Sequence, residues 1–396
     1  MKTIFICYDI AMRIGIEASR ANRAEKTGVE WYAYHLIQEL KKMPSAMDHS
    51  WLLYGNTPLA RGLEKGPVNW HEVLLSWPPT YLWTQLCLTL EMKRHAPDVL
   101  FVPAHVLPRI IPKHSVVTVH DVGFSRLPHL YPGFNKLPSI PTSTPRRFFE
   151  WSTKDIVKRA SKILTVSEFS KRELVEIYKA DPAKVFVTYL GLDHDRYTRA
   201  SSTEVQATLS RLCISAPYLA YVGRIEAKKN VGLLVQAFTR YKEQRGASDP
   251  LQLVLIGMPG MGADEVMRLI EASSVRDAIH VTGYVSEQDK IALLSGAKAM
   301  VHPAWYEGFG LTPLEAMACG CPVICSNAGS LPEVVGEENA LWFDPSNVEE
   351  LVECLTQFMN DDAYGHMLRE RGLVWCKKYT WAETARQTLD HLVSWE

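Results

Sequence analysis

A short segment of the chain carries two carboxylates eight residues apart: Glu307-Gly308-Phe309-Gly310-Leu311-Thr312-Pro313-Leu314-Glu315. Thr312 suits an N-cap, Pro313 suits the first helical position and Glu315 has capping-box spacing, so a helix is predicted to begin here. Gly308 and Gly310 let a ligand approach the backbone, and the free N–H groups of a helix start favour an anion such as a diphosphate. The carboxylates would then suit hydroxyl groups, although a capped helix with an acidic first turn explains the same residues.

Two further groups with useful chemistry follow predicted strands. Arg224 and Lys229 lie in a turn that begins with Gly223, directly after the apolar run 218–222. Arg can bind two phosphate oxygens at once and Lys adds a mobile charge, so this turn also suits a diphosphate, with a solvated basic loop as the alternative. His120 follows the apolar run 116–119, where a lone histidine is more often structural than catalytic.

The elements that would position these residues alternate between apolar strands and amphipathic helices, which is the pattern of a parallel α/β sheet. A helix is expected at about 29–42, after Gly28. The Ser- and Thr-rich stretch 197–215 separates two series of strands, so we place a domain boundary near residue 205. The expected strands are 13–18, 50–54, 99–102, 115–119 and 162–166 in the first domain, and 218–222, 251–256, 279–282, 299–301 and 322–325 in the second.

Length and composition agree with a two-domain enzyme. The chain has 396 residues, 47% of them hydrophobic, and a net charge of −1, so no global field favours nucleic acid as a partner. Cys319, Cys321 and Cys325 lack zinc-site spacing and are expected to be core residues beside a short strand. No apolar run approaches the roughly 20 residues of a membrane span, and no signal peptide is evident, so a cytoplasmic protein is expected.

The motifs taken together resemble those of the retaining glycosyltransferases of family 4, which have the GT-B architecture. The resemblance runs from about Met12 to the C-terminus, so residues 1–11 are interpreted as a possible extension. It rests on the order and spacing of Thr27-Gly28-Val29, His120-Asp121, Thr165-Val166-Ser167-Glu168-Phe169-Ser170, Gly191-Leu192-Asp193, Val222-Gly223-Arg224 through Lys229-Asn230, the Glu307-x7-Glu315 motif and Tyr379-Thr380-Trp381.

This resemblance implies two doubly wound, Rossmann-like domains that face each other across a cleft: an acceptor-side domain, 1–205, and a nucleotide-sugar domain, 206–376. The segment 377–396 would form a helix that crosses back to the first domain. By position in the family's motifs, Arg224 and Lys229 would neutralise the diphosphate, Glu315 would hold the ribose hydroxyls and Glu307 would touch the transferred sugar. Sugar and phosphate oxygens would be bound by the backbone of Gly308, Phe309, Gly310, Leu311 and Thr312.

On the acceptor side, the same resemblance implies that Gly28 lets the first domain close on the diphosphate and that His120 orients the reacting sugar. No metal is expected at the site. Asp193-His194-Asp195 matches the Asp-x-Asp of the other glycosyltransferase fold, but it follows Gly191-Leu192 in a loop and is interpreted as incidental. No enzyme nucleophile is named, because family members are expected to react by same-face attack; Glu307 as nucleophile is the alternative.

Residues 146–162 contain six Lys or Arg residues and two acidic ones, interleaved with aromatic side chains. The stretch predicts a basic amphipathic helix, which can rest on an anionic membrane. The alternative is an ordinary surface helix that packs its aromatic residues onto the sheet.

Among family members, the chain looks most like the mannosyltransferases of bacterial O-antigen and surface-polysaccharide synthesis. GDP-mannose is therefore the favoured donor, with a UDP-hexose next, and a glycan or lipid-linked molecule is the expected acceptor. No separate cofactor is expected. The alternatives are a sugar-nucleotide epimerase of the same fold and a non-catalytic protein that binds sugar nucleotides.

Overall fold

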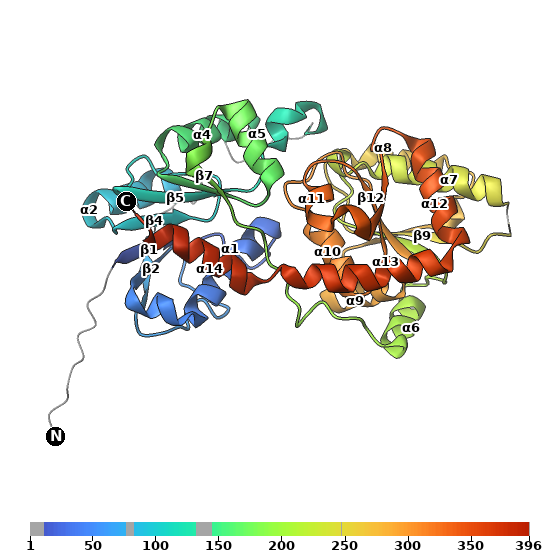
Figure 1. Ribbon diagram of the computed structural model, residues 1–396, viewed down its shortest axis with the longest axis horizontal. Coiled ribbons are helices and arrows are strands. Elements are labelled where there is room, and N and C mark those ends of the chain that lie inside the picture. The colour runs from blue at the N-terminus through green and yellow to red at the C-terminus, as the bar shows by residue number, and fades with distance from the viewer. Residues whose placement is uncertain (1–11, 77–82, 132–144, 247, 396) are drawn as a thin grey trace, which may run out of the picture. The chain divides into compact units, whose positions relative to one another are not determined.

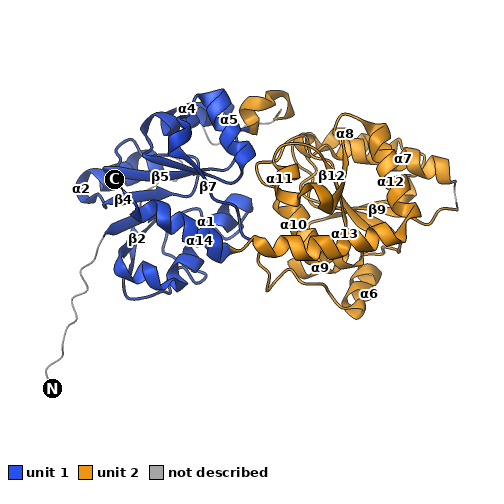
Figure 2. Ribbon diagram, in the orientation of Figure 1, with its two compact units in different colours: residues 1–122, 135–191, 381–396 blue, residues 123–134, 192–380 orange. Residues whose placement is uncertain are grey.

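The computed structural model describes residues 12–76, 83–131, 145–246 and 248–395, and the chain divides into two compact units (Figure 1, Figure 2). Unit 1 comprises residues 1–122, 135–191 and 381–396; unit 2 comprises residues 123–134 and 192–380. The division falls at Gly191/Leu192 rather than near residue 205, because Tyr197 and Ala200 already bond to unit 2: Tyr197 to Glu287, and the Ala200 N–H to Ser295 Oγ at 2.9 Å. The possible extension, residues 1–11, lies outside the described residues.

Unit 1 contains one parallel sheet in the order β3-β2-β1-β4-β5-β6-β7. Strands β2 and β3 follow on one side of β1 and strands β4 to β7 on the other, so the strand order reverses between β1 and β4. Its strands are β1 (Arg13–Glu17), β2 (Ser50–Gly55), β3 (Trp70–Leu74), β4 (Val99–Val102), β5 (His114–Val119), β6 (Lys162–Thr165) and β7 (Val185–Val187). Its helices are α1 (Gly28–Lys42), η1 (Pro44–Asp48), η3 (Thr84–Leu88), α2 (Thr89–His95), α4 (Pro145–Arg159), α5 (Glu168–Tyr178), η5 (Pro182–Lys184) and α14 (Trp381–Val393).

Unit 2 contains a second parallel sheet in the order β10-β9-β8-β11-β12-β13, which is the Rossmann order 3-2-1-4-5-6 counted from β8. Its strands are β8 (Tyr218–Val222), β9 (Gln252–Ile256), β10 (Ile279–Gly283), β11 (Ala299–His302), β12 (Val323–Ser326) and β13 (Ala340–Phe343). Its helices are α3 (Gly123–Arg126), η4 (Pro128–Leu130), α6 (Ser202–Arg211), η6 (Ala227–Lys229), α7 (Val231–Arg245), α8 (Ala263–Glu271), η7 (Arg276–Ala278), α9 (Glu287–Gly296), α10 (Leu311–Ala318), α11 (Leu331–Val335), η8 (Glu337–Asn339), α12 (Val348–Asn360), α13 (Asp362–Trp375) and η9 (Cys376–Lys378).

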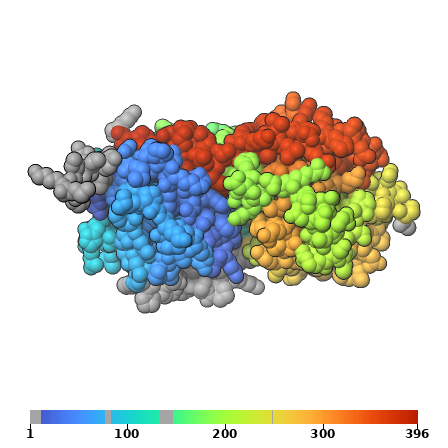
Figure 3. All heavy atoms as spheres, turned by 90° about the horizontal axis from the view of Figure 1, so that it is seen from below, coloured from blue at the N-terminus to red at the C-terminus, as the bar shows by residue number. Residues whose placement is uncertain are grey.

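Helices cover both faces of the unit 2 sheet. Helices α7, α8 and α12 pack together in one layer, while α9, α10 and α13 belong to the other. Apart from the edge strand β10, the strands are largely buried, and a core that includes Tyr221, Leu253 and Leu255 joins the sheet to α7. Helix α6 packs on α9 and is exposed on the surface of unit 2, as the space-filling view shows in yellow-green (Figure 3).

The predicted strands are confirmed to within one or two residues, whereas β3, β7 and β13 were not expected. Strand β3 lies at the sheet edge and is largely exposed, so its sequence Trp-His-Glu-Val-Leu has no long apolar run. Strand β7 has only three residues, which is too short for a clear pattern, and β13 is the short apolar run Ala-Leu-Trp-Phe. Cys319, Cys321 and Cys325 are buried in or before β12, as expected for core residues.

The glycine-rich loop after β9 shapes the loop after β8. Gly257 has a φ of +148°, and a Cβ placed on it would lie 2.0 Å from the carbonyl oxygen of Gly223. Further along, the Ile225 N–H donates to Met258 O at 3.0 Å and the Ala227 N–H donates to Met261 O at 2.9 Å. The segment 257–262 therefore supports the backbone that carries Arg224 and Lys229.

Helix α4 is anchored to the loop after β4 by buried polar contacts. His105 Nε2 hydrogen-bonds to Thr153 Oγ1 at 2.9 Å, and Ser152 Oγ donates to the carbonyl oxygen of His105. Burial lowers the pKa of His105 to about 4, although the carboxylate of Asp121 acts in the opposite direction. His105 is therefore neutral in the folded protein at pH 7.

None of the helices in the described part of the chain is both long enough and apolar enough to cross a membrane.

The contact between Gly257 and Gly223 predicts a stability loss that depends on position. We expect Gly257→Ala to destabilise unit 2 by about 2–3 kcal/mol, because both the positive φ and the close carbonyl oxygen oppose a side chain. Gly28→Ala is the control, since a Cβ there meets nothing within 4 Å. Thermal unfolding of both variants tests this, and equal melting temperatures would contradict it.

Buried neutral His105 predicts a loss of stability in acid. Its folded pKa lies below the ordinary value of 6.5, so the unfolded chain binds the proton more readily. The stabilisation is complete above about pH 6.5 and is lost as pH falls towards 4, by about 2–3 kcal/mol at most. Melting temperatures between pH 7 and 4.5 should fall less steeply for His105→Asn than for the unchanged protein; parallel curves would show that His105 does not contribute.

Candidate functional site

The predicted donor-binding residues of unit 2 lie at the point where its strand order reverses. Strands β8 and β11 are neighbours, and the chain leaves them in opposite directions along the sheet. In sheets of this kind, ligands bind beyond the carboxyl ends of the strands at such a reversal. The loop after β8 carries Arg224 and Lys229, and the loop after β11 carries Glu307.

The structure brings Lys229 and Glu307 together. Lys229 Nζ forms an ion pair with Glu307 Oε1, and His302 Nε2 lies 2.9 Å from the same oxygen. Because Glu307 is ionised, His302 donates this hydrogen bond through Nε2–H. Burial alone would raise the pKa of Glu307, but the Lys229 ammonium and the His302 hydrogen bond hold it well below its usual range. Glu307 is thus an ionised carboxylate, which can accept hydrogen bonds from hydroxyl groups but has no proton to donate.

The turn that holds Glu307 is built on the loop after β12. Ser330 is fully buried and its Oγ lies 3.0 Å from Glu307 O and 2.8 Å from Phe309 O. A Cβ on Gly329 would lie 2.6 Å from the carbonyl oxygen of Glu307, so this approach needs glycine. The ring of Phe309 is buried edge-on against Tyr379, with centroids 5.6 Å apart. Phe309 therefore fixes the turn by packing.

Helix α10 begins earlier than predicted. Its N-cap is Gly310 with a φ of +99°, and Leu311, Thr312 and Pro313 occupy its first three positions. The prediction of Thr312 as N-cap and Pro313 as the first residue was wrong, because the left-handed backbone at Gly310 already turns the chain into the helix. No side chain caps this end of α10, so the backbone N–H groups of its first residues can bind an anion. Pro313 has no N–H and contributes none.

The second carboxylate of the motif is held separately from the first. Glu315 is buried, and its Oε2 lies 3.2 Å from Lys290 Nζ on α9. Glu315 therefore pairs with Lys290 and does not form the capping box that its spacing from Thr312 suggested. Burial raises the pKa of Glu315, and the Lys290 ammonium acts against that rise.

Arg224 differs from Lys229 in its surroundings. Its side chain is 65% exposed, and Nε lies 3.4 Å from Glu226 Oε1 in the same loop. The guanidinium is thus free to reorient at little cost, whereas the Lys229 ammonium is already engaged by a buried carboxylate.

The candidate residues of unit 1, His120 and Gly28, are both associated with helix α1. His120 is held at the end of β5, where its ring packs edge-on against Tyr32 of α1 with centroids 4.7 Å apart. Its Nε2 lies 3.1 Å from Pro103 O; a carbonyl oxygen only accepts, so Nε2 carries the proton. Burial lowers the pKa of His120, which leaves a neutral ring whose Nδ1 is the accepting nitrogen. Gly28 begins the same helix that supplies Tyr32.

The Asp-x-Asp sequence takes part in a turn. Asp193 Oδ1 accepts from the Arg196 N–H at 3.1 Å, and the intervening His194 donates through Nε2 to Tyr379 O at 2.9 Å. Among the residues that the structure describes, no three His, Cys, Asp or Glu side chains are grouped as metal ligands.

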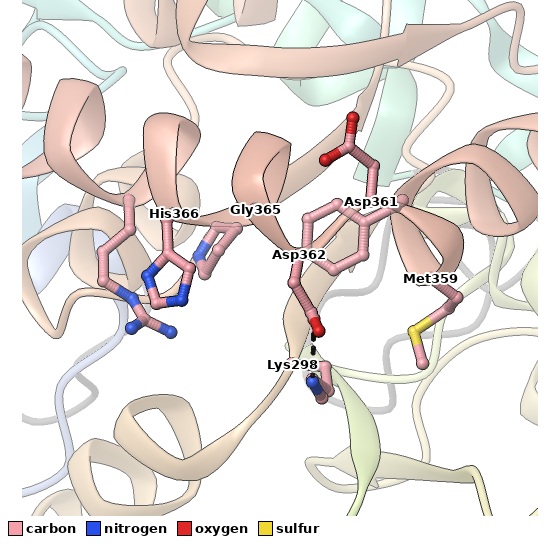
Figure 4. A pocket seen from close by; sticks show the side chains of 9 residues that line it. Lys298, Met359, Asp361, Asp362, Gly365 and His366 are labelled. Carbon is pink, nitrogen blue, oxygen red and sulfur yellow. Dashed lines mark hydrogen bonds and ion pairs between the residues drawn. The ribbon is translucent and has the colours of Figure 1, made fainter.

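Two cavities in unit 2 are lined by other residues. One of about 350 Å³ adjoins the β8–α7 loop and includes Glu226, Asn230 and Trp305. The other, of about 60 Å³, lies at the amino ends of the strands, where Lys298 pairs with Asp362 at 3.3 Å (Figure 4). Since the strands' carboxyl ends carry the candidate residues, the second cavity is at the wrong edge of the sheet for them.

Sequence reasoning missed four residues that support the site: His302, Ser330, Lys290 and Tyr197. His302 had a weak signal, because it ends the strand that leads into Glu307. The others come from α9, from the loop after β12 and from the segment before α6, and only the folded chain brings them to the motif.

Comparison with known proteins agrees with this geometry. Residues 26–196 match the family "Glycosyltransferase Family 4", and residues 215–375 match "Glycosyl transferases group 1". The chain is 32% identical over 279 residues to O-antigen chain mannosyltransferase B of Escherichia coli, covering 70% of each chain. It is 28% identical over 282 residues to the serotype-specific mannosyltransferase WbdA of Escherichia coli, where it spans 71% of its own length but only 33% of the relative's.

Solved structures show the same architecture. HepE of Anabaena in complex with UDP-glucose superimposes with a TM-score of 0.71 at 16% identity, covering 96% of this chain and 100% of that one. Sucrose-phosphate synthase of Thermosynechococcus elongatus gives a TM-score of 0.70 at 18% identity, covering 96% and 97%. These likenesses establish the GT-B fold. Together with the sequence matches on both units, they show that the chain belongs to glycosyltransferase family 4.

Proposed function

We propose that the protein transfers mannose from GDP-mannose to a glycan or lipid-linked acceptor during surface-polysaccharide synthesis, with retention of the anomeric configuration. The observation that carries this proposal is the partly buried Lys229–Glu307 pair at the strand-order reversal of unit 2, in a chain similar to O-antigen chain mannosyltransferase B. A nucleotide-sugar donor is also supported by HepE, which was solved with UDP-glucose.

The chemistry requires a site that stabilises a departing nucleoside diphosphate. As the bond to the sugar breaks, negative charge grows on the diphosphate, and fixed cations and N–H groups stabilise it. Lys229, the mobile Arg224 and the uncapped start of α10 supply these groups. Glu307, held ionised, would accept a hydrogen bond from a sugar hydroxyl. This bond would replace the contact with Lys229 when the lysine turns to the diphosphate.

His120 fits the role of orienting the sugar rather than moving a proton. Its neutral ring presents Nδ1 as an acceptor, because Nε2–H is committed to Pro103 O. A hydroxyl of the transferred hexose would donate to Nδ1, and Gly28 would leave open space for the diphosphate, since nothing lies within 4 Å of a Cβ at that position.

Contact with an anionic membrane is proposed for one stripe of α4. Arg147, Trp151, Lys154 and Lys158 are exposed at intervals of four, three and four residues, which places them on one side of the helix. Trp151 is 47% exposed, whereas Ile156 is fully buried. The other basic residues of 146–162 bond within the protein: Arg146 to Glu150, Arg159 to Asp155, and Lys162 to the carbonyl oxygen of His391.

The donor assignment predicts a selective thermal shift. GDP-mannose at 100 times its dissociation constant should stabilise the protein by about 2.7 kcal/mol, and UDP-hexoses should stabilise it less. Differential scanning fluorimetry with a panel of sugar nucleotides measures this. If no sugar nucleotide raises the melting temperature, the proposed function is wrong.

The same assay tests Lys229 against its neighbour. Lys229→Ala should remove most of the donor-induced shift, taken relative to the variant's own unliganded melting temperature, and should reduce transfer by about 100-fold or more. Lys228→Ala is the matched control, because the Lys228 ammonium lies 5.5 Å from the centre of the Tyr131 ring, whereas the ion pair with Glu307 is made by Lys229. An equal response of the two variants would remove the diphosphate role of Lys229.

The membrane contact predicts charge-dependent sedimentation. The triple variant Arg147→Gln/Lys154→Gln/Lys158→Gln should bind vesicles of phosphatidylglycerol about two orders of magnitude more weakly, at about 1 kcal/mol per basic residue. Arg240→Gln/Arg268→Gln/Arg276→Gln makes the same change of charge on exposed residues of unit 2 and should bind normally. Absence of binding by the unchanged protein, or equal loss in both variants, would end this proposal.

A further inference from the structure

The carboxylate of Glu315 lies in a network of four side chains within unit 2. Lys290 Nζ lies 3.2 Å from Glu315 Oε2, 3.0 Å from Glu287 Oε2 and 2.7 Å from the hydroxyl oxygen of Tyr197. The Tyr197 hydroxyl in turn donates to Glu287 Oε2 at 2.6 Å. The network therefore joins α9, α10 and the segment that precedes α6.

Lys290 has no freedom to leave this network. An ammonium group has three N–H donors, and three oxygens surround it at hydrogen-bonding or ion-pair distance. The Lys290 side chain is 14% exposed and lies over the Tyr197 ring, 4.8 Å from its centre. Glu315 is therefore held by a cation that is itself fixed by Glu287 on its own helix, α9, and by Tyr197 in the segment before α6.

The charges explain why the cation is needed. Burial raises the pKa of Glu315, the Lys290 ammonium opposes this rise, and the nearby Glu287 carboxylate adds to it. Without Lys290, the buried Glu315 carboxylate would face the Glu287 carboxylate with no cation between them, and Glu315 would take up a proton or turn away. A protonated or displaced Glu315 could not accept hydrogen bonds from two hydroxyl groups.

We propose that Lys290 is a positioning residue that keeps the Glu315 carboxylate in place to accept the ribose hydroxyls of the nucleotide. This inference rests on the proposed function, since it names the part of the donor that the Lys290–Glu315 pair recognises. A carboxylate has about four lone-pair positions, so one bond to Lys290 leaves room for both ribose hydroxyls. Lys290 acts through Glu315 and does not itself touch the nucleotide.

The test compares nucleotides with and without the ribose hydroxyls. Dissociation constants for GDP, UDP and their 2′,3′-dideoxy forms are measured by calorimetry on the full-length protein. The unchanged protein should bind the hydroxylated nucleotide at least about tenfold more tightly, because hydrogen bonds to a charged group are strong. In Lys290→Met, this ratio should fall to within about threefold of unity, whereas a merely structural loss would weaken both nucleotides alike.

Three further variants keep the result interpretable. Lys290→Gln removes the charge with less change in polarity and should also lower the ratio, so it serves if Lys290→Met does not fold. Lys290→Arg should keep the ratio within about threefold of the original, because it restores a cation. Lys298→Met is the matched control: that lysine pairs with Asp362 at the opposite edge of the sheet, and its loss should not change the ratio.

The outcomes separate the two proposals. If the unchanged protein discriminates between the nucleotides and folded Lys290→Met or Lys290→Gln discriminates equally well, the role of Lys290 is wrong while the proposed function stands. If the unchanged protein binds neither GDP nor UDP, the proposed function fails, and the inference fails with it.

Discussion

The arrangement of unit 2 depends on one partly buried carboxylate, that of Glu307. A buried charge is costly unless it is paired and hydrogen-bonded, and Glu307 meets both conditions through Lys229 and His302. Each partner comes from a different neighbouring strand end, so the pairing ties the loop after β8 to the loop after β11. The loop after β12 holds the backbone of Glu307 in place: the Ser330 hydroxyl donates to the carbonyl oxygen of Glu307, and Gly329 allows the two segments to lie close together.

The two carboxylates of the motif are controlled in different ways, although only eight residues separate them. Glu307 shares one oxygen between a lysine and a histidine, and its pKa is held low. Glu315 has a lysine that it shares with a second carboxylate, and its pKa is raised. Glu307 precedes α10 and Glu315 lies within it, so one short segment offers two acceptors of unequal strength.

Much of this organisation could be predicted from the sequence, because parallel strands buried on both faces leave continuous apolar runs. These runs located ten strands and, with them, the loops that carry Arg224, Lys229 and Glu307. The start of α10 was misplaced, since residue propensities favoured Thr312 while the backbone conformation of Gly310 decided it. Lys290 and Tyr197 could not be found, because nothing in their local sequence marks a partner 25 or more residues away.

The pairing of Lys229 with Glu307 has a consequence for selectivity. An empty site with a bare lysine would attract any small anion, such as inorganic phosphate, but here the cation is already neutralised by a neighbour. An ion that brings only negative charge must compete with Glu307 and leaves that carboxylate buried without its partner. A ligand that also carries hydroxyl donors can satisfy the displaced carboxylate as it takes the lysine. In the proposed donor site, the ion pair would therefore disfavour anions that carry no hydroxyl groups.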